Sequence, residues 1–418
     1  MSMSVISELR MRPAALQSPR WDASVRTRLA LAVVVMSTLL VGANLATPLY
    51  PLIRAELGLS AFHTTAAFAA YVFTLVAGLL LVGHWSDHIG RRAALVLAVL
   101  TGILGAVVFG GATSLPMLIL GRCLQGAAVA CAIGASSAAL RDLLPHRPEW
   151  ASRFTLVASA GGVAAGPALG GLLSLLPDPT RLPFALYAAF LGLLLVPLVL
   201  LDARPAIRPA APARPLSALK PRRPAVSRTA RRAFWSAAAV GFLSFAVFGF
   251  SLSLAPTYFA GITGYDSRPL AGLLAGLVLA ASAASQLFPQ RGGHGSGAAV
   301  PGLLVMAGGV ALIPVAGVTG NVVLLLAALV LAGSGQGVAF RRVFNTVAQQ
   351  VEGSQHAQII STVYVITYLG SAVPVLGLGL AADAMGLAAA VAVFAGLVSA
   401  GCVGMAVLLG RTPVTASI

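Results

Sequence analysis

Apolar runs of about 20 residues recur along the whole chain, and they limit its fold more than any other feature. A helix needs about 20 such residues to cross the core of a bilayer. The 418-residue chain is 58% hydrophobic and 9% charged, whereas soluble domains are about a quarter charged. We therefore predict an all-α membrane protein. Its twelve transmembrane helices are expected at residues 29–52, 62–83, 93–113, 115–139, 153–176, 182–202, 233–259, 268–288, 298–317, 319–340, 356–379 and 386–410.

The basic residues predict which ends of these spans face the cytoplasm. With the N-terminus assigned to the cytoplasm, 23 of the 27 Lys and Arg lie in cytoplasmic segments and three lie in outer loops. Cytoplasmic loops of membrane proteins carry such an excess. Both termini are therefore expected in the cytoplasm. The net charge of +16 follows from this topology, so we expect the lipid bilayer and no nucleic acid as a partner.

A basic segment divides the spans into six and six. Residues 203–232 hold nine basic residues, six prolines and no acid, a composition that cannot bury a core. The predicted organisation is a cytoplasmic N-tail (1–28), an N-terminal six-helix bundle (29–202), a cytoplasmic linker (203–232), a C-terminal six-helix bundle (233–410) and a C-tail (411–418).

The two bundles share short sequence patterns. Gln125-Gly126 and Gln336-Gly337 lie 211 residues apart, and Pro167 and Pro374 lie 207 residues apart. The near-constant offset predicts two pseudo-symmetric six-helix bundles. Duplicated bundles of this kind are a transporter architecture, with the substrate site between the halves near the bilayer midplane.

Three motifs occur in order in the first half of the chain. The stretch between spans 2 and 3 reads Gly83-x-x-x-Asp87-His88-x-Gly90-Arg91-Arg92, span 4 holds Arg122-x-x-Gln125-Gly126, and span 5 holds Gly162-x-x-x-Gly166-Pro167-x-x-Gly170-Gly171. Together they resemble motifs of the major facilitator superfamily, and within it the drug/proton antiporters, although His88 stands where Arg is usual. The resemblance implies alternating access. It also implies gating or coupling roles for Gly83, Asp87, Gly90, Arg91, Arg92, Arg122, Gly162, Gly166, Pro167 and Gly170.

Each motif also has a physical interpretation and a simpler alternative. Asp87 can accept hydrogen bonds from Arg91 or from a helix N-terminus, and such a cluster could latch the two halves on the cytoplasmic side. Small residues in span 5 allow close helix packing, and Pro167 bends the helix. The alternatives are that Arg91 and Arg92 only set topology, and that the glycines serve generic packing.

Arg122 is the sole ionisable residue deep within a predicted span, and a charge there is a functional hypothesis by default. The alternative is an arginine that snorkels to the membrane surface. No acid or His lies mid-span, and span 1 has Asn44 and Thr47 where related antiporters commonly carry an acid. Three hypotheses follow: a neutral or anionic substrate attracted by Arg122, protons carried by Glu56 or Asp87, or transport without protons. We favour the first, combined with some proton coupling.

Polar and aromatic residues within spans are the remaining candidates for contact with a small-molecule substrate. Phe242, Phe245 and Phe248 form an aromatic stripe in span 7, for which helix packing is the alternative. The predicted substrate-binding residues are Asn44, Tyr71, Arg122, Gln125, Phe245, Gln336, Tyr364 and Tyr368.

These observations predict a secondary transporter that exports a small drug or metabolite by proton antiport, as a monomer in the bacterial inner membrane. The alternatives are an uptake symporter or facilitator and, more remotely, a receptor or lipid flippase. We expect no enzyme, cofactor or metal. Lys220, the sole lysine, follows no Gly-rich loop, which excludes a P-loop pump. Ser136 and Ser137 have no His within any span to activate them.

Overall fold

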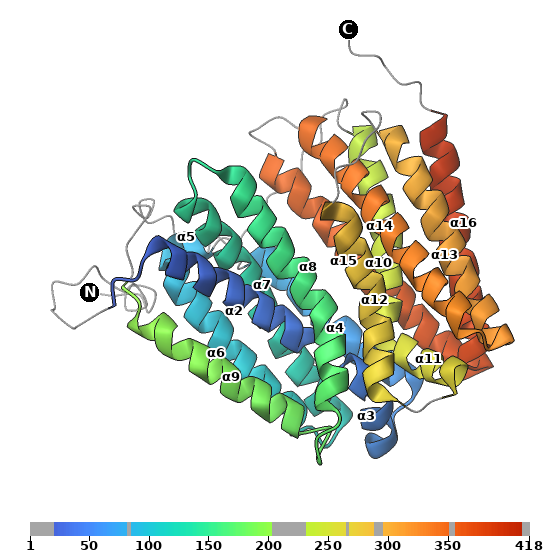
Figure 1. The fold of residues 1–418 in the computed structure, drawn as a ribbon, viewed down its shortest axis with the longest axis horizontal. Coiled ribbons are helices and arrows are strands. Elements are labelled where there is room, and N and C mark those ends of the chain that lie inside the picture. The colour runs from blue at the N-terminus through green and yellow to red at the C-terminus, as the bar shows by residue number, and fades with distance from the viewer. Residues whose placement is uncertain are drawn as a thin grey trace, which may run out of the picture. The chain divides into compact units, whose positions relative to one another are not determined.

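The structure is a computed structural model, and it describes residues 21–81, 85–202, 231–264, 267–287, 296–350 and 356–411 (Figure 1). Twelve helices in these ranges are long and apolar enough to cross a membrane, as the sequence predicted. The helices are α2 (Val25–Asn44), η1 (Thr47–Leu49), α3 (Tyr50–Leu57), α4 (Ala61–Leu81), α5 (Trp85–Ile89), α6 (Arg91–Gly110), α7 (Leu115–Leu143), α8 (Pro148–Leu173), α9 (Leu182–Leu200), α10 (Arg231–Ser253), α11 (Ala255–Thr263), α12 (Arg268–Leu287), η2 (Ser296–Ala299), α13 (Val300–Thr319), α14 (Val322–Gln350), α15 (His356–Met385) and α16 (Leu387–Gly410).

Spans 1 and 7 are interrupted, which corrects the prediction of one continuous helix in each. The first span passes from α2 through η1 to α3, and the seventh passes from α10 to α11. Each interruption precedes or includes a proline, Pro48 or Pro256, and proline lacks the amide hydrogen that a helix needs. These prolines lie 208 residues apart. The shared break therefore extends the internal repeat that the sequence indicated.

The short helices after the two breaks end in the same way. The residue after α3 is Gly58 with φ of 60°, and the residue after α11 is Gly264 with φ of 67°. Left-handed backbone at a helix end is favourable for glycine because it has no Cβ.

Contacts between Cα atoms divide the chain into two units. The first unit holds Met1–Asn44, Phe73–Gly166 and Leu176–Pro221, and the second holds Leu45–Val72, Pro167–Leu175 and Arg222–Ile418. Within the first unit α6 packs between α7 and α9, and within the second α13 packs between α14 and α16. Two segments of the N-terminal half of the sequence, Leu45–Val72 and Pro167–Leu175, thus belong to the second unit. They hold the predicted outer ends of spans 1, 2 and 5.

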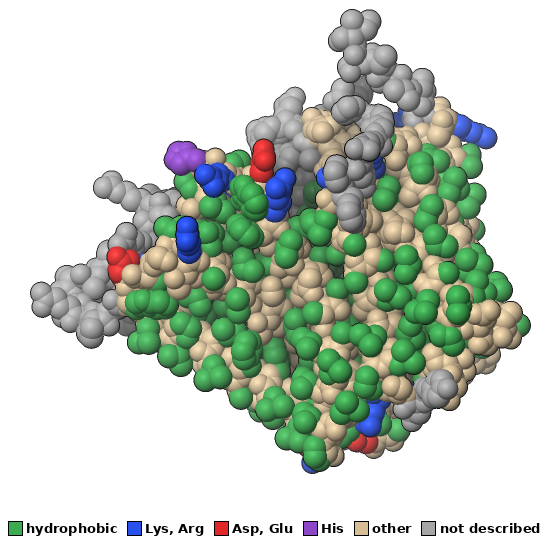
Figure 2. Space-filling view, in the orientation of Figure 1, with side chains coloured by type: hydrophobic (Ala, Val, Ile, Leu, Met, Phe, Trp, Pro, Cys, Tyr) green, Lys and Arg blue, Asp and Glu red, His purple; other side chains and the backbone are tan. Residues whose placement is uncertain are grey.

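Hydrophobic side chains cover most of the face shown in Figure 2, and the described Lys, Arg, Asp and Glu side chains in view lie near its margins. Large exposed apolar residues occur along most spans, for example Leu193 at 69% and Leu397 at 71% exposure. Such a surface suits hydrocarbon surroundings. The chain is a multi-pass membrane protein.

Candidate functional site

Arg122 lies on the third turn of α7 and is 1% exposed. Its Nη1 donates a hydrogen bond of 2.7 Å to the Ala43 carbonyl oxygen and another of 2.7 Å to Gln125 Oε1. The guanidinium carbon also stands 5.7 Å from the centre of the Phe109 ring. A buried guanidinium is tolerated where acceptors surround it. Two predicted site residues, Arg122 and Gln125, are therefore in direct contact within the first unit.

The Arg122 side chain binds a backbone carbonyl group in the last turn of α2. Helix α2 ends at Asn44, and the last carbonyls of any helix lack partners inside that helix. Arg122 satisfies the Ala43 carbonyl, while Asn44 Nδ2 donates a 2.8 Å hydrogen bond back to the Leu40 carbonyl. The C-terminal end of a helix also carries partial negative charge, which favours a cation there. This arrangement holds the end of α2 against α7.

The span-5 glycines bring α8 against the same part of α2. A Cβ on Gly162 would lie 2.7 Å from the Ser37 carbonyl oxygen, and one on Gly166 would lie 2.6 Å from Asn44 Cβ. Ser37 Oγ also donates a 3.2 Å hydrogen bond to the Ala158 carbonyl oxygen. Three predicted site residues, Asn44, Arg122 and Gly166, thus converge on the last turn of α2.

The motif continues into the second unit. A Cβ on Gly170 would collide with the Leu45 carbonyl oxygen, and one on Gly171 would lie 2.9 Å from the Arg268 carbonyl oxygen. Pro167 lies inside α8, where it removes a backbone donor. A Cβ added to Gly272 of α12 would collide with the carbonyl oxygen of Pro167. The C-terminal end of α8 therefore packs on α12 at glycines from both helices.

Helix α14 carries Gln336, which corresponds to Gln125 in the repeat, but its surroundings differ. Ser282 Oγ donates a hydrogen bond to Gln336 Oε1, and Gln286 Nε2 donates one of 3.1 Å to Ser282 Oγ. The residue that corresponds to Arg122 is Gly333, where a Cβ would collide with the Val278 carbonyl oxygen. One half of the chain thus has a buried guanidinium at a position where the other has a tight helix contact.

A group of six half-buried aromatic residues connects α10, α14 and α15, and we call it the aromatic cluster. The Phe245 ring centre lies 5.4 Å from Phe248, 5.9 Å from Phe340 and 5.3 Å from Tyr368. These spacings are typical of interacting rings. The full cluster is Phe245, Phe248, Phe340, Phe344, Tyr364 and Tyr368.

Three predicted substrate-binding residues, Phe245, Tyr364 and Tyr368, are therefore brought together in the aromatic cluster. A fourth, Tyr71 of α4, is buried, and its ring centre lies 6.3 Å from that of Phe68. Phe340 and Phe344 were not predicted. They lie four residues apart and thus on one helix face, which is the signal in the sequence that could have indicated them.

The predicted cytoplasmic motif forms contacts that the sequence did not indicate. Arg91 Nε lies 2.8 Å from Asp142 Oδ2, and Arg91 Nη1 lies 2.6 Å from Ser86 Oγ. Arg92 donates hydrogen bonds to the Leu198 and Val199 carbonyl oxygens at 2.8 and 2.6 Å. The motif thus ties the start of α6 to the end of α7 and to the end of α9.

Other residues of that motif are placed less fully. Gly90 precedes α6 with φ of 91°, a conformation that glycine adopts without strain. Gly83 and the side chain of Asp87 lie outside the described residues. The predicted contact of Asp87 with Arg91 or a helix N-terminus therefore stays a prediction.

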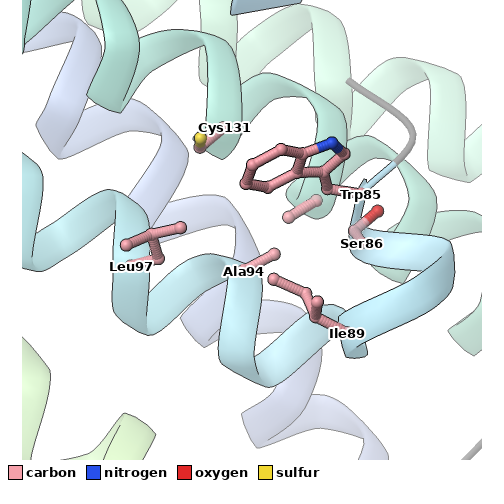
Figure 3. A pocket seen from close by; sticks show the side chains of 7 residues that line it. Trp85, Ser86, Ile89, Ala94, Leu97 and Cys131 are labelled. Atoms are coloured by element: carbon pink, nitrogen blue, oxygen red, sulfur yellow. The ribbon is translucent and has the colours of Figure 1, made fainter. Parts of the chain in front are cut away.

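A small hollow lies beside the same motif (Figure 3). Trp85, Ile89, Ala94, Leu97 and Cys131 are among its lining residues. Ligand pockets usually offer a few convergent polar groups. Ser86 is the polar residue in this lining, and none of the predicted substrate-binding residues belongs to it. We therefore assign the hollow no part in substrate binding.

Twelve spans, an internal repeat and tightly packed motif residues define a class of multi-pass membrane transport proteins. A family model described as Major Facilitator Superfamily matches residues 31–372. The chain belongs to this superfamily.

Individual relatives are distant. The chain is 30% identical over 151 residues to Multidrug resistance protein 1 of Bacillus subtilis, which covers 36% of this chain and 38% of that protein. It is 36% identical over 118 residues to the class E tetracycline resistance protein of Escherichia coli, covering 27% of each. The matches thus span well under half the length of these relatives. A solved bacterial homologue of the human lysosomal transporter Spinster has a TM-score of 0.70 at 15% identity, covering 92% of this chain and 95% of that one.

Proposed function

We propose that this protein is a secondary transporter that exports a small organic molecule in exchange for protons, by alternating access. The observation that carries the proposal is the convergence of Arg122, Asn44 and Gly166 on the last turn of α2. A broken span held by a buried charge and by close glycine contacts is suited to moving as a unit. Export is favoured by the names of two relatives, which describe resistance to drugs.

The position of Arg122 favours a coupling role over direct contact with substrate. Its side chain is 1% exposed, and Nη1 is engaged by Ala43 and Gln125. A proton or substrate that perturbs these hydrogen bonds would free the end of α2 to move. In this proposal, a change in the hydrogen bonds of Arg122 alters the position of α2 during the transport cycle.

The aromatic cluster supplies the proposed substrate surface. Its six rings present faces and edges that attract flat, unsaturated molecules, and Tyr71 and Gln336 complete the proposed set of substrate-binding residues within the second unit. Each acid that the structure describes on a spanning helix lies near a helix end: Glu56, Asp142, Glu149 and Asp383. A buried organic cation would lack a nearby carboxylate, so a neutral or anionic aromatic substrate is favoured.

The test is flux into proteoliposomes with an imposed pH gradient. Matched probes of equal charge, one aromatic and one saturated, are screened with and without a protonophore, and protein-free liposomes give the background. We expect the aromatic probe to accumulate against its concentration gradient, and we expect this accumulation to stop when the protonophore is added. Saturable binding without flux, or tight binding of a lipophilic cation by an Arg122→Ala variant, would contradict the proposal.

The cellular setting is part of the proposal. We infer a monomer in a bacterial inner membrane with both termini in the cytoplasm, because the basic residues concentrate in segments on one predicted side. Uptake is the alternative direction, and the same assay with the pH gradient reversed separates the two.

A further inference from the structure

Asp383 makes a contact that joins the two halves of the sequence within the second unit. Its Oδ1 accepts a 2.9 Å hydrogen bond from the Ala61 amide, and its Oδ2 accepts a 3.1 Å hydrogen bond from the Phe62 amide. These are the first two residues of α4, the second span, whereas Asp383 lies near the end of α15, the eleventh. Both carboxylate oxygens therefore bind the start of a helix 321 and 322 residues away in sequence.

The start of a helix favours a negatively charged acceptor such as the Asp383 carboxylate. The first amides of a helix have no partners inside that helix, and the partial positive charge at this end favours an anion. Hydrogen bonds to an ionised acceptor are also stronger than those between neutral groups. The start of α4 thus offers Asp383 two donors at once.

A second feature of the same two helices points to the same interface. One turn before Asp383, a Cβ added to Gly379 would collide with Thr65 Oγ1 and come within 3.0 Å of Phe62 Cα. Thr65 is 0% exposed. Gly379 therefore permits the close approach of α4 and α15, and Asp383 caps the helix that is brought near.

We propose that Asp383 and Gly379 form a latch that holds the predicted outer ends of α4 and α15 together and must release once per transport cycle. The inference rests on the proposed alternating access, because a rocking transporter has to separate its halves at each face in turn. Asp383 is a positioning residue here and touches no substrate. Its loss shifts the population toward states in which this end is open.

The test measures access to Thr65, which is buried while the latch is closed. A Thr65→Cys variant is reconstituted in nanodiscs and alkylated with a membrane-impermeant maleimide, and mass spectrometry of peptides gives the rate at each cysteine. Native Cys402, 0% exposed in the core of the second unit, reports general unfolding in the same sample. The assay needs no substrate, so it can succeed or fail independently of the proposed export.

Two pairs of variants, made in the Thr65→Cys protein, test the two parts of the latch. Asp383→Ala should raise the alkylation rate at position 65 about tenfold, equivalent to about 1.4 kcal/mol, and leave Cys402 unchanged. Its control is Asp178→Ala, an exposed acid paired with nearby Arg181. Gly379→Ala should raise the rate as well, whereas Gly377→Ala should not, because a Cβ there meets nothing within 4 Å.

The outcomes are distinct. An unchanged rate at position 65 in Asp383→Ala overturns the latch, as does an equal rise at Cys402, which would mean general loosening. Asp383→Asn keeps the size of the side chain and one carbonyl acceptor, so its rate should fall between those of the parent and Asp383→Ala. A rate in Asp383→Asn equal to that of the parent would show that the negative charge is not needed and would overturn the charge-based part of the proposal.

Discussion

Arg122 of α7 donates a hydrogen bond to the carbonyl oxygen of Ala43, in the last turn of α2. The contact joins a side chain from the fourth span to the backbone of the first at the place where that span is broken. The geometry at the end of α2 therefore depends on the Arg122 guanidinium. Substitution of Arg122 tests how far stability and transport depend on this contact.

Replacing Arg122 by Ala should abolish proton-driven accumulation and lower thermal stability. It leaves the Ala43 carbonyl and Gln125 Oε1 without this donor, and an unsatisfied buried polar group costs about 1–3 kcal/mol. Arg122→Lys should recover part of the stability, because one donor can reach one acceptor. Arg153→Ala is the control, since Arg153 is exposed and stacks on Trp150. Full transport by Arg122→Ala in proteoliposomes would refute the coupling role.

Gly166→Ala should destabilise the protein and slow transport. The added Cβ would lie 2.6 Å from Asn44 Cβ and 2.8 Å from the Val41 carbonyl oxygen, and overpacking typically costs about 1–3 kcal/mol. The melting temperature and the rate of flux are the measurements. Gly161→Ala on the same helix has nothing within 4 Å of its Cβ, so it should match the parent. Equal behaviour of the two variants would show that α8 and α2 are not in close contact.

Breaking the Arg91–Asp142 ion pair should change transport more than stability. Each side chain is 20% exposed, and partly exposed pairs contribute about 0.2–1 kcal/mol. A double-mutant cycle with Arg91→Ala and Asp142→Ala should give a coupling energy in this range and a clear fall in flux. The mostly exposed Arg181–Asp178 pair at 3.9 Å provides the comparison. Additive effects of the two substitutions on melting would argue against the pair.

Phe340→Leu should weaken binding of aromatic substrates and spare saturated ones. Phe340 contacts Phe245 and Phe344 at 5.9 and 5.6 Å, and an aromatic partner is worth about 0.5–1.5 kcal/mol beyond its buried area. The expected loss of affinity is therefore about threefold to tenfold. Phe190→Leu, at a 47% exposed position of α9, is the control. Equal losses for aromatic and saturated probes would assign the cluster to packing.

Sequence patterns predicted the membrane class, the number of spans and the internal repeat because these follow from composition and periodicity along the chain. They did not predict the breaks in spans 1 and 7, although Pro48 and Pro256 were visible. A proline inside a span can either bend or interrupt the helix, and the surrounding packing decides.

The candidate site shows the same limit. The spacing of Arg122 and Gln125 placed both on one turn of a helix, and the structure joins them. The sequence did not indicate the partners of Asp142 and Asp383, because these partners lie 51 and more than 320 residues away. The sequence also predicted a helix that ended before Asp383, whereas α15 extends to Met385. Contacts of this kind depend on how helices cross, which local spacing does not determine.

Gly333 occupies in the second half of the repeat the position that Arg122 occupies in the first. Moving one elementary charge through the full membrane potential changes its energy by about 2.3 kcal/mol per 100 mV. Any displacement of Arg122 along the membrane normal therefore does electrical work, whereas the same displacement of Gly333 does none. The membrane voltage therefore acts on Arg122 of α7 but has no charge to act on at Gly333 of α14. The difference at this one position makes the two corresponding helices electrically distinct.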